Sequence, residues 1–330
     1  MEFLQFLSSL GLPCREFKEL KELRELTGTV MADSFSIRPL KTIDECRQAE
    51  ELQRVVWRLD DLDVTPSHVL LTFAKNGGVV LGAFAVSGGR EHMVGCVFGF
   101  IGTREGLYAP EAPAQVRLKH CSHQLGVLPE WQSQGVGYAL KLAQREAVRS
   151  QALRLITWTY DPLESRNANL NIAKLGAVCD TYIPNLYGEL RDELNRGLPT
   201  DRFQVDWWIA SQRVETRLSR RRPPLTRALY QRAGTRILNE ATFDERGLPT
   251  PPDAIEPLHD DRALVEFPAL FQDVKRLDTQ LALAWREQSR AIFQPAFAAG
   301  FTVTDMLYER DVTPRAFYVL TRTESSEHAD

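Results

Sequence analysis

Residues 127–137, VLPEWQSQGVG, constrain the fold more than any other stretch of the chain. An apolar run, HQLGVL, leads into this segment and a strong helix pattern, GYALKLAQREAVRSQA, follows it, so the order is strand, loop, helix. The first backbone N–H groups of a helix have no partner within the helix and carry a partial positive charge. Gly135 and Gly137 have no Cβ and let a ligand approach the backbone closely. The segment therefore predicts a phosphate or pyrophosphate site at the helix start.

Other readings of the glycines fit less well. A dinucleotide fingerprint needs a third glycine at position 140, where the chain has Leu140, although Asp161 lies at roughly the right distance for a ribose carboxylate. A P-loop needs Gly-Lys-Ser/Thr, which the segment lacks. A tight strand-to-helix turn whose glycines serve geometry alone is the structural alternative.

The segment resembles the acyl-CoA-binding loop of the GNAT acyltransferase superfamily, whose pattern is V-x-P-x-x-[RQ]-x-x-G-x-[GA]. Its fixed positions are filled by Val127, Pro129, Gln132, Gly135 and Gly137. The resemblance implies that the loop amides hold the pyrophosphate of an acyl-CoA and that the preceding strand pairs with the pantetheine arm. The residues that it assigns to this cosubstrate are Leu125, Val127, Gln132, Ser133, Gln134, Gly135, Val136, Gly137, Asn167 and Asn171.

The order of elements over residues 34–211 is similar to that of the same superfamily. Hydrophobic periodicity, a capping box at Thr42 and Glu45, and glycines at helix ends set the expected elements. Strands are expected at 34–40, 79–86, 93–102, 117–128, 153–160, 178–183 and 203–210, and helices at 42–59, 67–75, 135–150 and 165–175. The expected fold is therefore α/β of the α+β type: a GNAT fold with a central mixed, twisted sheet flanked by helices.

Three further parts are expected outside this domain. Residues 1–33 form an N-terminal extension that need not be ordered, and residues 212–262 form a linker rich in Pro, Asp and Arg. Residues 263–330 predict a strand, a helix that Pro295 kinks or ends, and a hairpin. This C-terminal β-α-β-β extension is expected to pack on the core. Its order repeats the last third of the core, either as a degenerate half-repeat or by chance.

Composition excludes several classes of partner. The net charge of −4 and the pI of about 6.0 give no basic field for nucleic acid. No apolar run approaches the ~18 residues of a membrane span. The five cysteines form no CxxC motif, which favours reduced thiols in the cytoplasm, and no metal-ligand spacing occurs. The expected partner is a small-molecule amine, with a homodimer left open.

The resemblance implies direct attack of an amine on the thioester of an acyl-CoA, such as acetyl-CoA or succinyl-CoA, in a ternary complex without a metal. A base must take the ammonium proton. His123 titrates in the useful range, and strand alternation puts it on one face with Leu125 and Val127. In several enzymes of the superfamily a base lies on this strand. A histidine bonded within the sheet is the structural alternative.

The other catalytic roles have more than one candidate. Asp161, Glu164 or a water chain are alternative bases. The superfamily often uses a tyrosine to protonate the thiolate, but alignment on the glycine at 176 puts Ile172 at that position. Tyr187 and Tyr160 are therefore the candidate acids.

An acceptor with a carboxylate needs a cation, for which Arg166, Arg202 and Arg117 are the candidates. The segments SHQLGVLP and LITWTYDPLESRNA further resemble a GNAT branch, some of whose members are linked to the acylation of amino acids, including with succinyl-CoA. A non-catalytic acyl-CoA sensor and a protein-modifying acetyltransferase are the alternative functions.

Overall fold

The computed structural model describes residues 30–32, 35–59, 61–104, 117–188, 197–219 and 225–322. Most of the expected N-terminal extension and residues 220–224 of the expected linker lie outside this set. The chain divides into two compact units, residues 1–102 with 122–152 and residues 103–121 with 153–330. Strand β5 (Leu118–Val127) passes from the second unit into the first.

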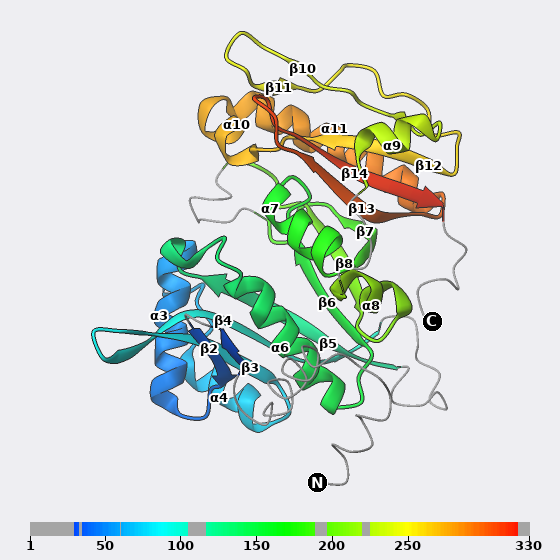
Figure 1. The fold of residues 1–330 in the computed structure, drawn as a ribbon. Coiled ribbons are helices and arrows are strands. Elements are labelled where there is room, and N and C mark those ends of the chain that lie inside the picture. The colour runs from blue at the N-terminus through cyan, green and yellow to red at the C-terminus, as the bar shows by residue number, and fades with distance from the viewer. Residues whose placement is uncertain are drawn as a thin grey trace. The chain divides into compact units, whose positions relative to one another are not determined.

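The first unit contains the antiparallel strands β1 (Val30–Ala32), β2 (Phe35–Pro39), β3 (Val79–Ser87) and β4 (Arg90–Thr103), hydrogen-bonded in that order (Figure 1). Its helices are α3 (Ile43–Trp57), α4 (Ser67–Lys75) and α6 (Val136–Ser150). Thr42 and Glu45 cap α3 reciprocally, which confirms the capping box predicted from the sequence.

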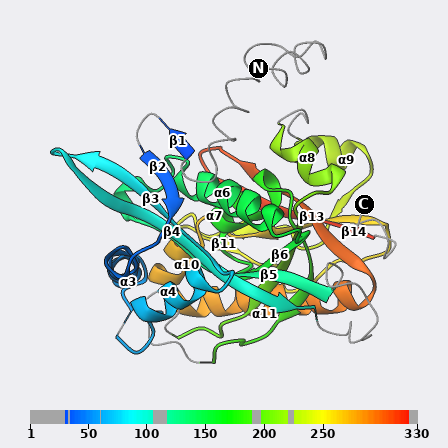
Figure 2. The same ribbon diagram turned by 90° about the horizontal axis from the view of Figure 1, so that it is seen from below.

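Helices cover the strands of the first unit on two sides, with α3 and α4 on one side and α6 on the other (Figure 2). Phe98 of β4 packs in one apolar cluster with Leu52 of α3 and Leu70 of α4. On the other side, a Cβ on Gly95 would lie 3.1 Å from the Val136 side chain of α6. The missing side chain at this position therefore lets α6 approach β4 closely.

The second unit holds the rest of the mixed sheet, in the order β5-β6-β8-β7-β13-β14-β12-β9. Its strands are β6 (Leu155–Tyr160), β7 (Val178–Ile183), β8 (Arg202–Trp208), β9 (Arg236–Ile237), β12 (Arg262–Phe267), β13 (Phe301–Glu309) and β14 (Arg315–Arg322). A separate hairpin joins β10 (Thr242–Phe243) to β11 (Pro249–Thr250). The helices are α7 (Ser165–Ala168), the π-helix η2 (Asn169–Lys174), α8 (Gln212–Leu218), α9 (Arg227–Arg232), α10 (Phe271–Leu277) and α11 (Thr279–Ala298).

Strand directions make this sheet mixed. β5 and β6 run parallel through the pairs His120↔Ile156 and Cys121↔Thr157. β6 and β8, and β8 and β7, run antiparallel. An α/β fold with a mixed sheet flanked by helices is therefore confirmed.

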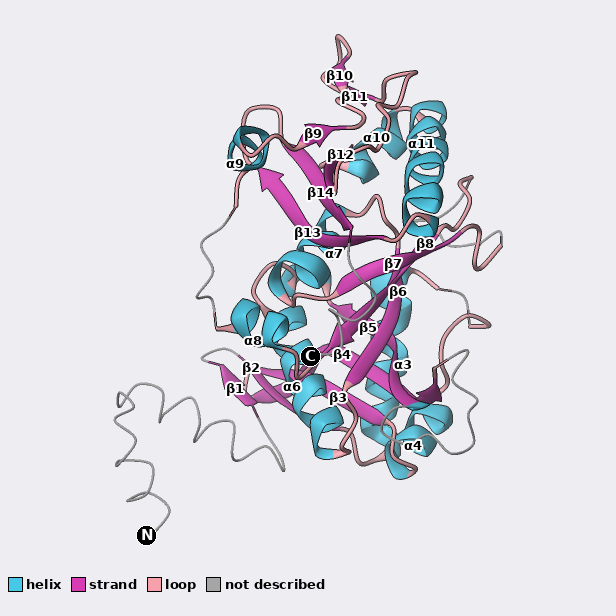
Figure 3. Cartoon of the chain, turned by 90° about the vertical axis from the view of Figure 1, so that its right-hand side faces the viewer, coloured by secondary structure: helices cyan, strands magenta, loops and turns pink. Residues whose placement is uncertain are grey.

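The C-terminal strands extend the sheet with a two-fold strand order. The strands β6, β8 and β7 lie in that order, followed by β13, β14 and β12 of the C-terminal module. If β12, β13 and β14 correspond to β6, β7 and β8, the module has the same strand order in the opposite direction across the sheet. The two sets meet where β7 pairs with β13 antiparallel, at Cys179↔Val303. Helix α11 packs on β7 and β13 (Figure 3). This helix continues past Pro295 to Ala298. The interruption lies instead at Asp278, whose carboxylate accepts a hydrogen bond from the Leu281 N–H and caps α11.

Side chains of the C-terminal module hold the end of β6. Arg286 of α11, 2% exposed, donates to both carboxylate oxygens of Asp161, to Oδ1 at 2.8 Å. The Tyr318 hydroxyl of β14 donates to the Pro162 carbonyl at 2.7 Å and lies 3.1 Å from the Tyr160 hydroxyl. The segment that follows β6 is thus fixed from the far end of the sequence.

We expect Arg286→Met to lower the free energy of unfolding by about 3 kcal/mol, because the substitution leaves a partly buried carboxylate without its bidentate partner. Urea unfolding followed by circular dichroism measures the change. The matched control is Arg276→Met, which removes an exposed guanidinium paired with Asp273 and is expected to cost less than about 0.5 kcal/mol. Equal effects of the two substitutions would contradict a structural role for the Arg286–Asp161 pair.

Candidate functional site

The loop between β5 and α6 is tied back to the end of the strand. A short 3-10 helix, η1 (Pro129–Trp131), opens the loop. The Gln132 side-chain amide then donates to the Val127 carbonyl at 3.1 Å. The position of the following residues is therefore fixed relative to β5.

The first turn of α6 presents backbone N–H groups that no side chain caps. Gly135 is the N-cap residue, with φ 88° and no side-chain hydrogen bond at the cap. A Cβ at this position would meet no atom within 4 Å, so glycine is needed for the left-handed backbone rather than for space. Ser133, Gln134 and Gly135 are exposed, whereas Val136 is 1% exposed and anchors the helix. An anion fits such a helix start.

Strand β5 packs under this turn. A Cβ on Gly137 would lie 3.5 Å from the Leu125 side chain and 3.7 Å from the Val127 side chain, which is ordinary contact. The structure thus brings together four of the residues assigned to the cosubstrate: Leu125, Val127, Gln132 and Gly137.

Ser122 also faces α6, which breaks the alternation of the strand. Its hydroxyl accepts a hydrogen bond from Lys141 Nζ at 2.8 Å and donates to Gln144 Oε1 at 3.0 Å. Residues 122 and 125 would lie on opposite faces of a regular strand. Because both face α6, β5 has an irregularity between them of the kind that one inserted residue produces.

His123 consequently faces away from α6. Its ring lies 5.7 Å from the Phe98 ring and 6.4 Å from the Phe100 ring, and Phe98 belongs to the cluster under α3 and α4. The prediction that His123 shares a face with Leu125 and Val127 is therefore wrong, because the alternation of side chains along β5 breaks between Ser122 and Leu125. Desolvation by the surrounding protein lowers the pKa of His123 from the ordinary 6.5. The imidazole is thus neutral at pH 7 and able to accept a proton.

In the second unit, Asp161 is engaged on all sides. Arg286 binds its carboxylate bidentately, Arg202 Nη1 lies 3.8 Å from Oδ2, and the Leu163 N–H donates to Oδ1 at 2.9 Å. These partners occupy the lone pairs of the carboxylate, so Asp161 is a poorer base candidate than His123. Burial, and then the charge of Asp161, raise the pKa of Glu164.

The tyrosine candidates for the acid differ in exposure. Tyr187 is 51% exposed, and its hydroxyl lies 3.1 Å from Thr159 Oγ1 of β6. Burial raises the pKa of Tyr160 well above the ordinary value, and its hydroxyl is bonded to Tyr318, so it is not available as an acid. Ile172 is fully buried in η2. Tyr187 is therefore the better placed of the two candidates.

The remaining predicted residues are spread over the second unit. Arg202 is 9% exposed and lies between Asp161 and the Tyr187 ring, whose centroid is 5.4 Å from the guanidinium carbon. Arg166 and Asn167 are exposed on α7, and Asn171 is 4% exposed in η2. Sequence reasoning missed Arg286 because 125 residues separate it from Asp161.

Two further properties bear on the class of site. Of the helices that the structure describes, none has the length and apolar character needed to cross a bilayer. Within the same residues, no group of three or more His, Cys, Asp or Glu side chains is arranged to hold a metal ion.

The order of elements in the first part of the chain follows the prediction from the sequence. Strand β2, helices α3 and α4, strands β3 to β5, the loop, α6, β6, the α7–η2 helix and the β7–β8 pair follow one another as the sequence led us to expect. Residues 35–208 thus have the order of elements that the resemblance to the GNAT superfamily predicts.

Comparison with known proteins gives matches of fold only. No protein-family model and no curated protein matches the sequence. Among solved structures, Arabidopsis thaliana NAA60 with acetyl-CoA is similar, with 15% identity and a TM-score of 0.43 over 54% of this chain and 100% of that chain. The NatC complex bound to Gag peptide and CoA is also similar, with 16% identity and a TM-score of 0.40 over 52% of this chain and 97% of that chain. So is aminoglycoside 6'-acetyltransferase type Ii, with 16% identity and a TM-score of 0.39 over 53% of this chain and 98% of that chain. Similarity at this level does not carry the acceptors or activities of those proteins over to this chain.

Gly135→Glu should weaken CoA binding by at least ~2 kcal/mol, because it puts a carboxylate where the GNAT pattern places the pyrophosphate. Isothermal calorimetry with CoA measures the loss. Gly135→Ala is the matched control: it shares the strain of a side chain at φ 88° but adds no charge, so the difference between the two variants reports the electrostatic part. If the folded Glu variant binds CoA as the Ala variant does, the anion is not bound there.

Proposed function

We propose that the chain is an acyl-CoA-dependent N-acyltransferase that acts on the amine of a small molecule. The observation that carries the proposal is the start of α6 at Gly135, uncapped by any side chain and tied to β5 through Gln132. Within a GNAT fold, such a helix start fits a CoA pyrophosphate. Acyl-CoA supplies the thioester carbonyl that the amine attacks.

The residues of β5 have separate tasks in this proposal. Val127 and Leu125 line the strand beside the first turn of α6, where the pantetheine arm would pair with the backbone. The irregularity between Ser122 and Leu125 turns backbone groups out of the regular ladder, and an N–H freed in this way would polarise the thioester carbonyl. His123 follows Ser122 on the other face and serves as the base.

The acid and the cations for the acceptor are those that the sequence predicted. The Tyr187 hydroxyl is exposed beside Thr159 and would protonate the leaving thiolate. Arg166, exposed on the surface of α7, and Arg202, which lies beside Asp161, are the two proposed cations for an acceptor carboxylate.

The acyl group and the acceptor are tested together. Acetyl-CoA and succinyl-CoA are assayed against free amino acids, polyamines and a lysine peptide, with free-thiol release as the readout. Preference for an amino acid supports a small-molecule acceptor, whereas preference for the peptide favours a protein-modifying enzyme. The cytoplasmic location and the choice between monomer and homodimer stay predictions of the sequence.

One observation favours a second candidate function. Ile172, buried and apolar, stands where the superfamily often has its acid tyrosine. A protein that binds acyl-CoA without turnover would show this loss. Tight acetyl-CoA binding without thiol release against the whole panel identifies such a sensor.

His123→Ala is expected to lower kcat by ~10²-fold or more at pH 7, the usual contribution of a positioned base. The deficit should shrink as the pH rises, because a growing share of the amine is then deprotonated in solution. KM for the acyl-CoA should barely change. Steady-state kinetics from pH 6 to pH 10 measure both.

His92→Ala is the control for this experiment, because His92 is an exposed histidine on the neighbouring strand β4. It should behave as the wild type. A His123 variant within a few-fold of wild type at every pH would remove His123 from the mechanism and leave Glu164 or a water chain as base.

A further inference from the structure

Strand β8 has two chemically different faces. Phe203, Val205 and Trp207 are completely buried, and the Trp207 indole donates to the carbonyl of Leu175, the residue after η2, at 2.9 Å. The alternate residues Gln204, Asp206 and Trp208 are only partly buried. The first face belongs to the core, and the second is polar enough to meet a ligand.

The register of the sheet places Asp206 in a defined row. Cys121 of β5 pairs with Thr157 of β6, Thr157 pairs with Asp206 of β8, and Asp206 pairs with Val178 of β7. Residues that pair directly on adjacent strands point to the same face. Asp206 therefore lies two strands from Cys121, on the face that Cys121 and Thr157 share.

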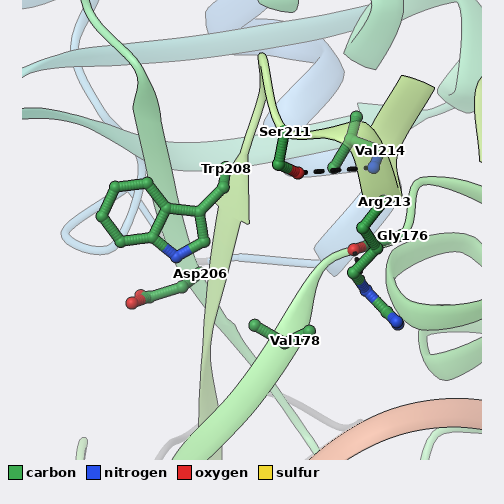
Figure 4. Close-up of a pocket in the computed structure, with 7 residues that line it drawn as sticks. All are labelled: Gly176, Val178, Asp206, Trp208, Ser211, Arg213 and Val214. Atoms are coloured by element: carbon green, nitrogen blue, oxygen red, sulfur yellow. Dashed lines mark hydrogen bonds between the residues drawn. The ribbon is translucent and has the colours of Figure 1, made fainter. Parts of the chain in front are cut away.

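Neighbouring rows complete this face. Thr159 pairs with Gln204 on one side, and Leu155 pairs with Trp208 on the other. Figure 4 shows Asp206 and Trp208 pointing to one side of β8, away from Arg213 and Val214. Asp206 thus has hydroxyl and amide groups on one side and an indole on the other.

The Asp206 carboxylate forms no hydrogen bond or ion pair with any residue that the structure describes. The charged groups around it are Asp180 of β7, Lys119 of β5 and Arg104, whose guanidinium lies 4.9 Å from the Trp208 ring. Burial, and then the charge of Asp180, raise the pKa of Asp206 to about 6 against the opposing effect of the two cations. A partly buried carboxylate without a partner reduces stability, so its presence calls for a role in binding.

We propose that Asp206 binds the ammonium group of the acyl acceptor, an inference that rests on the proposed acyltransferase function. An ammonium donates three hydrogen bonds, for which Asp206 offers a carboxylate and Thr157 a hydroxyl. The Trp208 ring offers an apolar surface to the carbon attached to the nitrogen. The acceptor class is therefore a primary amine that is protonated at neutral pH.

Binding precedes the transfer step. The ammonium then gives a proton to the base, its lone pair forms the C–N bond with the thioester carbon, and the C–S bond breaks. The leaving thiolate takes up a proton. Asp206 acts on the charged form of the amine, so its loss should raise KM for the acceptor more than it lowers kcat.

Two amines of similar size separate charge recognition from general damage. Benzylamine is protonated near neutral pH, whereas aniline is neutral. For the full-length protein with acetyl-CoA, free-thiol release is measured with each amine for the wild type and for Asp206→Asn. For Asp206→Asn, we expect kcat/KM for benzylamine to fall at least ~10-fold because KM rises, which is the scale of a lost charge-assisted hydrogen bond. We expect kcat/KM for aniline to change less than ~2-fold.

Asp180→Asn is the matched control. Asp180 is exposed on β7, and its carboxylate accepts a hydrogen bond from the Thr181 hydroxyl. This variant removes a nearby negative charge but leaves Asp206 in place. It should keep benzylamine turnover within ~2-fold of wild type.

The pH dependence gives an independent readout. Because the folded-state pKa of Asp206 is raised from 3.8 to about 6, the ionisation of Asp206 reduces stability as the pH rises through this window. Asp206→Asn should therefore melt at or above the wild-type temperature at pH 7, and the difference should vanish below pH 4. Protonation of the base lowers kcat/KM in both proteins at low pH, so the readout is the ratio of wild-type to variant kcat/KM for benzylamine, which should fall as the pH drops through about 6.

The outcomes separate this inference from the proposed function. Unchanged benzylamine kinetics in a folded Asp206→Asn variant, or equal losses with both amines, would overturn the role of Asp206 alone. A wild type that binds acetyl-CoA but releases no thiol with either amine would overturn both the acyltransferase assignment and the ammonium site. Selective loss with benzylamine, absent in Asp180→Asn, supports the ammonium site.

Discussion

The packing of α6 on β5 is the constraint on which the first unit depends. Gln132 ties the loop to the Val127 carbonyl, Gly137 rests on the Leu125 side chain, and Ser122 is bonded to Lys141 and Gln144 of the helix. Ser122 and Leu125 therefore both face α6. They are three residues apart, and in a regular strand such residues would lie on opposite faces. Only an irregular strand places both residues on the side of α6. His123, which lies between them in the sequence, faces the opposite side, near Phe98 and Phe100.

Local sequence signals were enough to predict the elements of residues 35–208 and the position of the loop, but the expected linker at 212–262 contains α8, α9 and the strands β9 to β11. The capping box at Thr42 and Glu45, the apolar periodicity of α6 and the pattern from Val127 to Gly137 act over a few residues, so the chain shows them directly. The irregularity in β5 was not predictable, because it arises from contacts between β5 and a helix that alternation alone does not describe. The Arg286–Asp161 pair was hidden for a related reason: the partners meet only after a whole strand-helix-hairpin module has folded.

This module repeats β6 to β8 in strand order but does not repeat the strand-loop-helix of β5 and α6. The start of its long helix α11 is capped by the Asp278 carboxylate, whereas the start of α6 is capped by no side chain. A carboxylate at a helix start satisfies the N–H groups that an anionic ligand would need. The start of α11 is therefore unlike the start of α6, and the module contributes by fixing Asp161 and Pro162 through Arg286 and Tyr318.

Strand β8 also has one face that packs in the core and one face that carries polar groups. Phe203 packs edge-on against Phe293 of α11 at 4.8 Å between ring centroids, and Trp207 meets Trp158 at 6.0 Å, so one face of the strand is secured by aromatic contacts. Because these contacts hold β8, the residues between them need not contribute to packing. Asp206 can then remain a carboxylate without a partner, at a cost in stability that the aromatic face compensates. Alternation along a single strand thus provides both the rigidity of this part of the sheet and a chemically distinct surface on it.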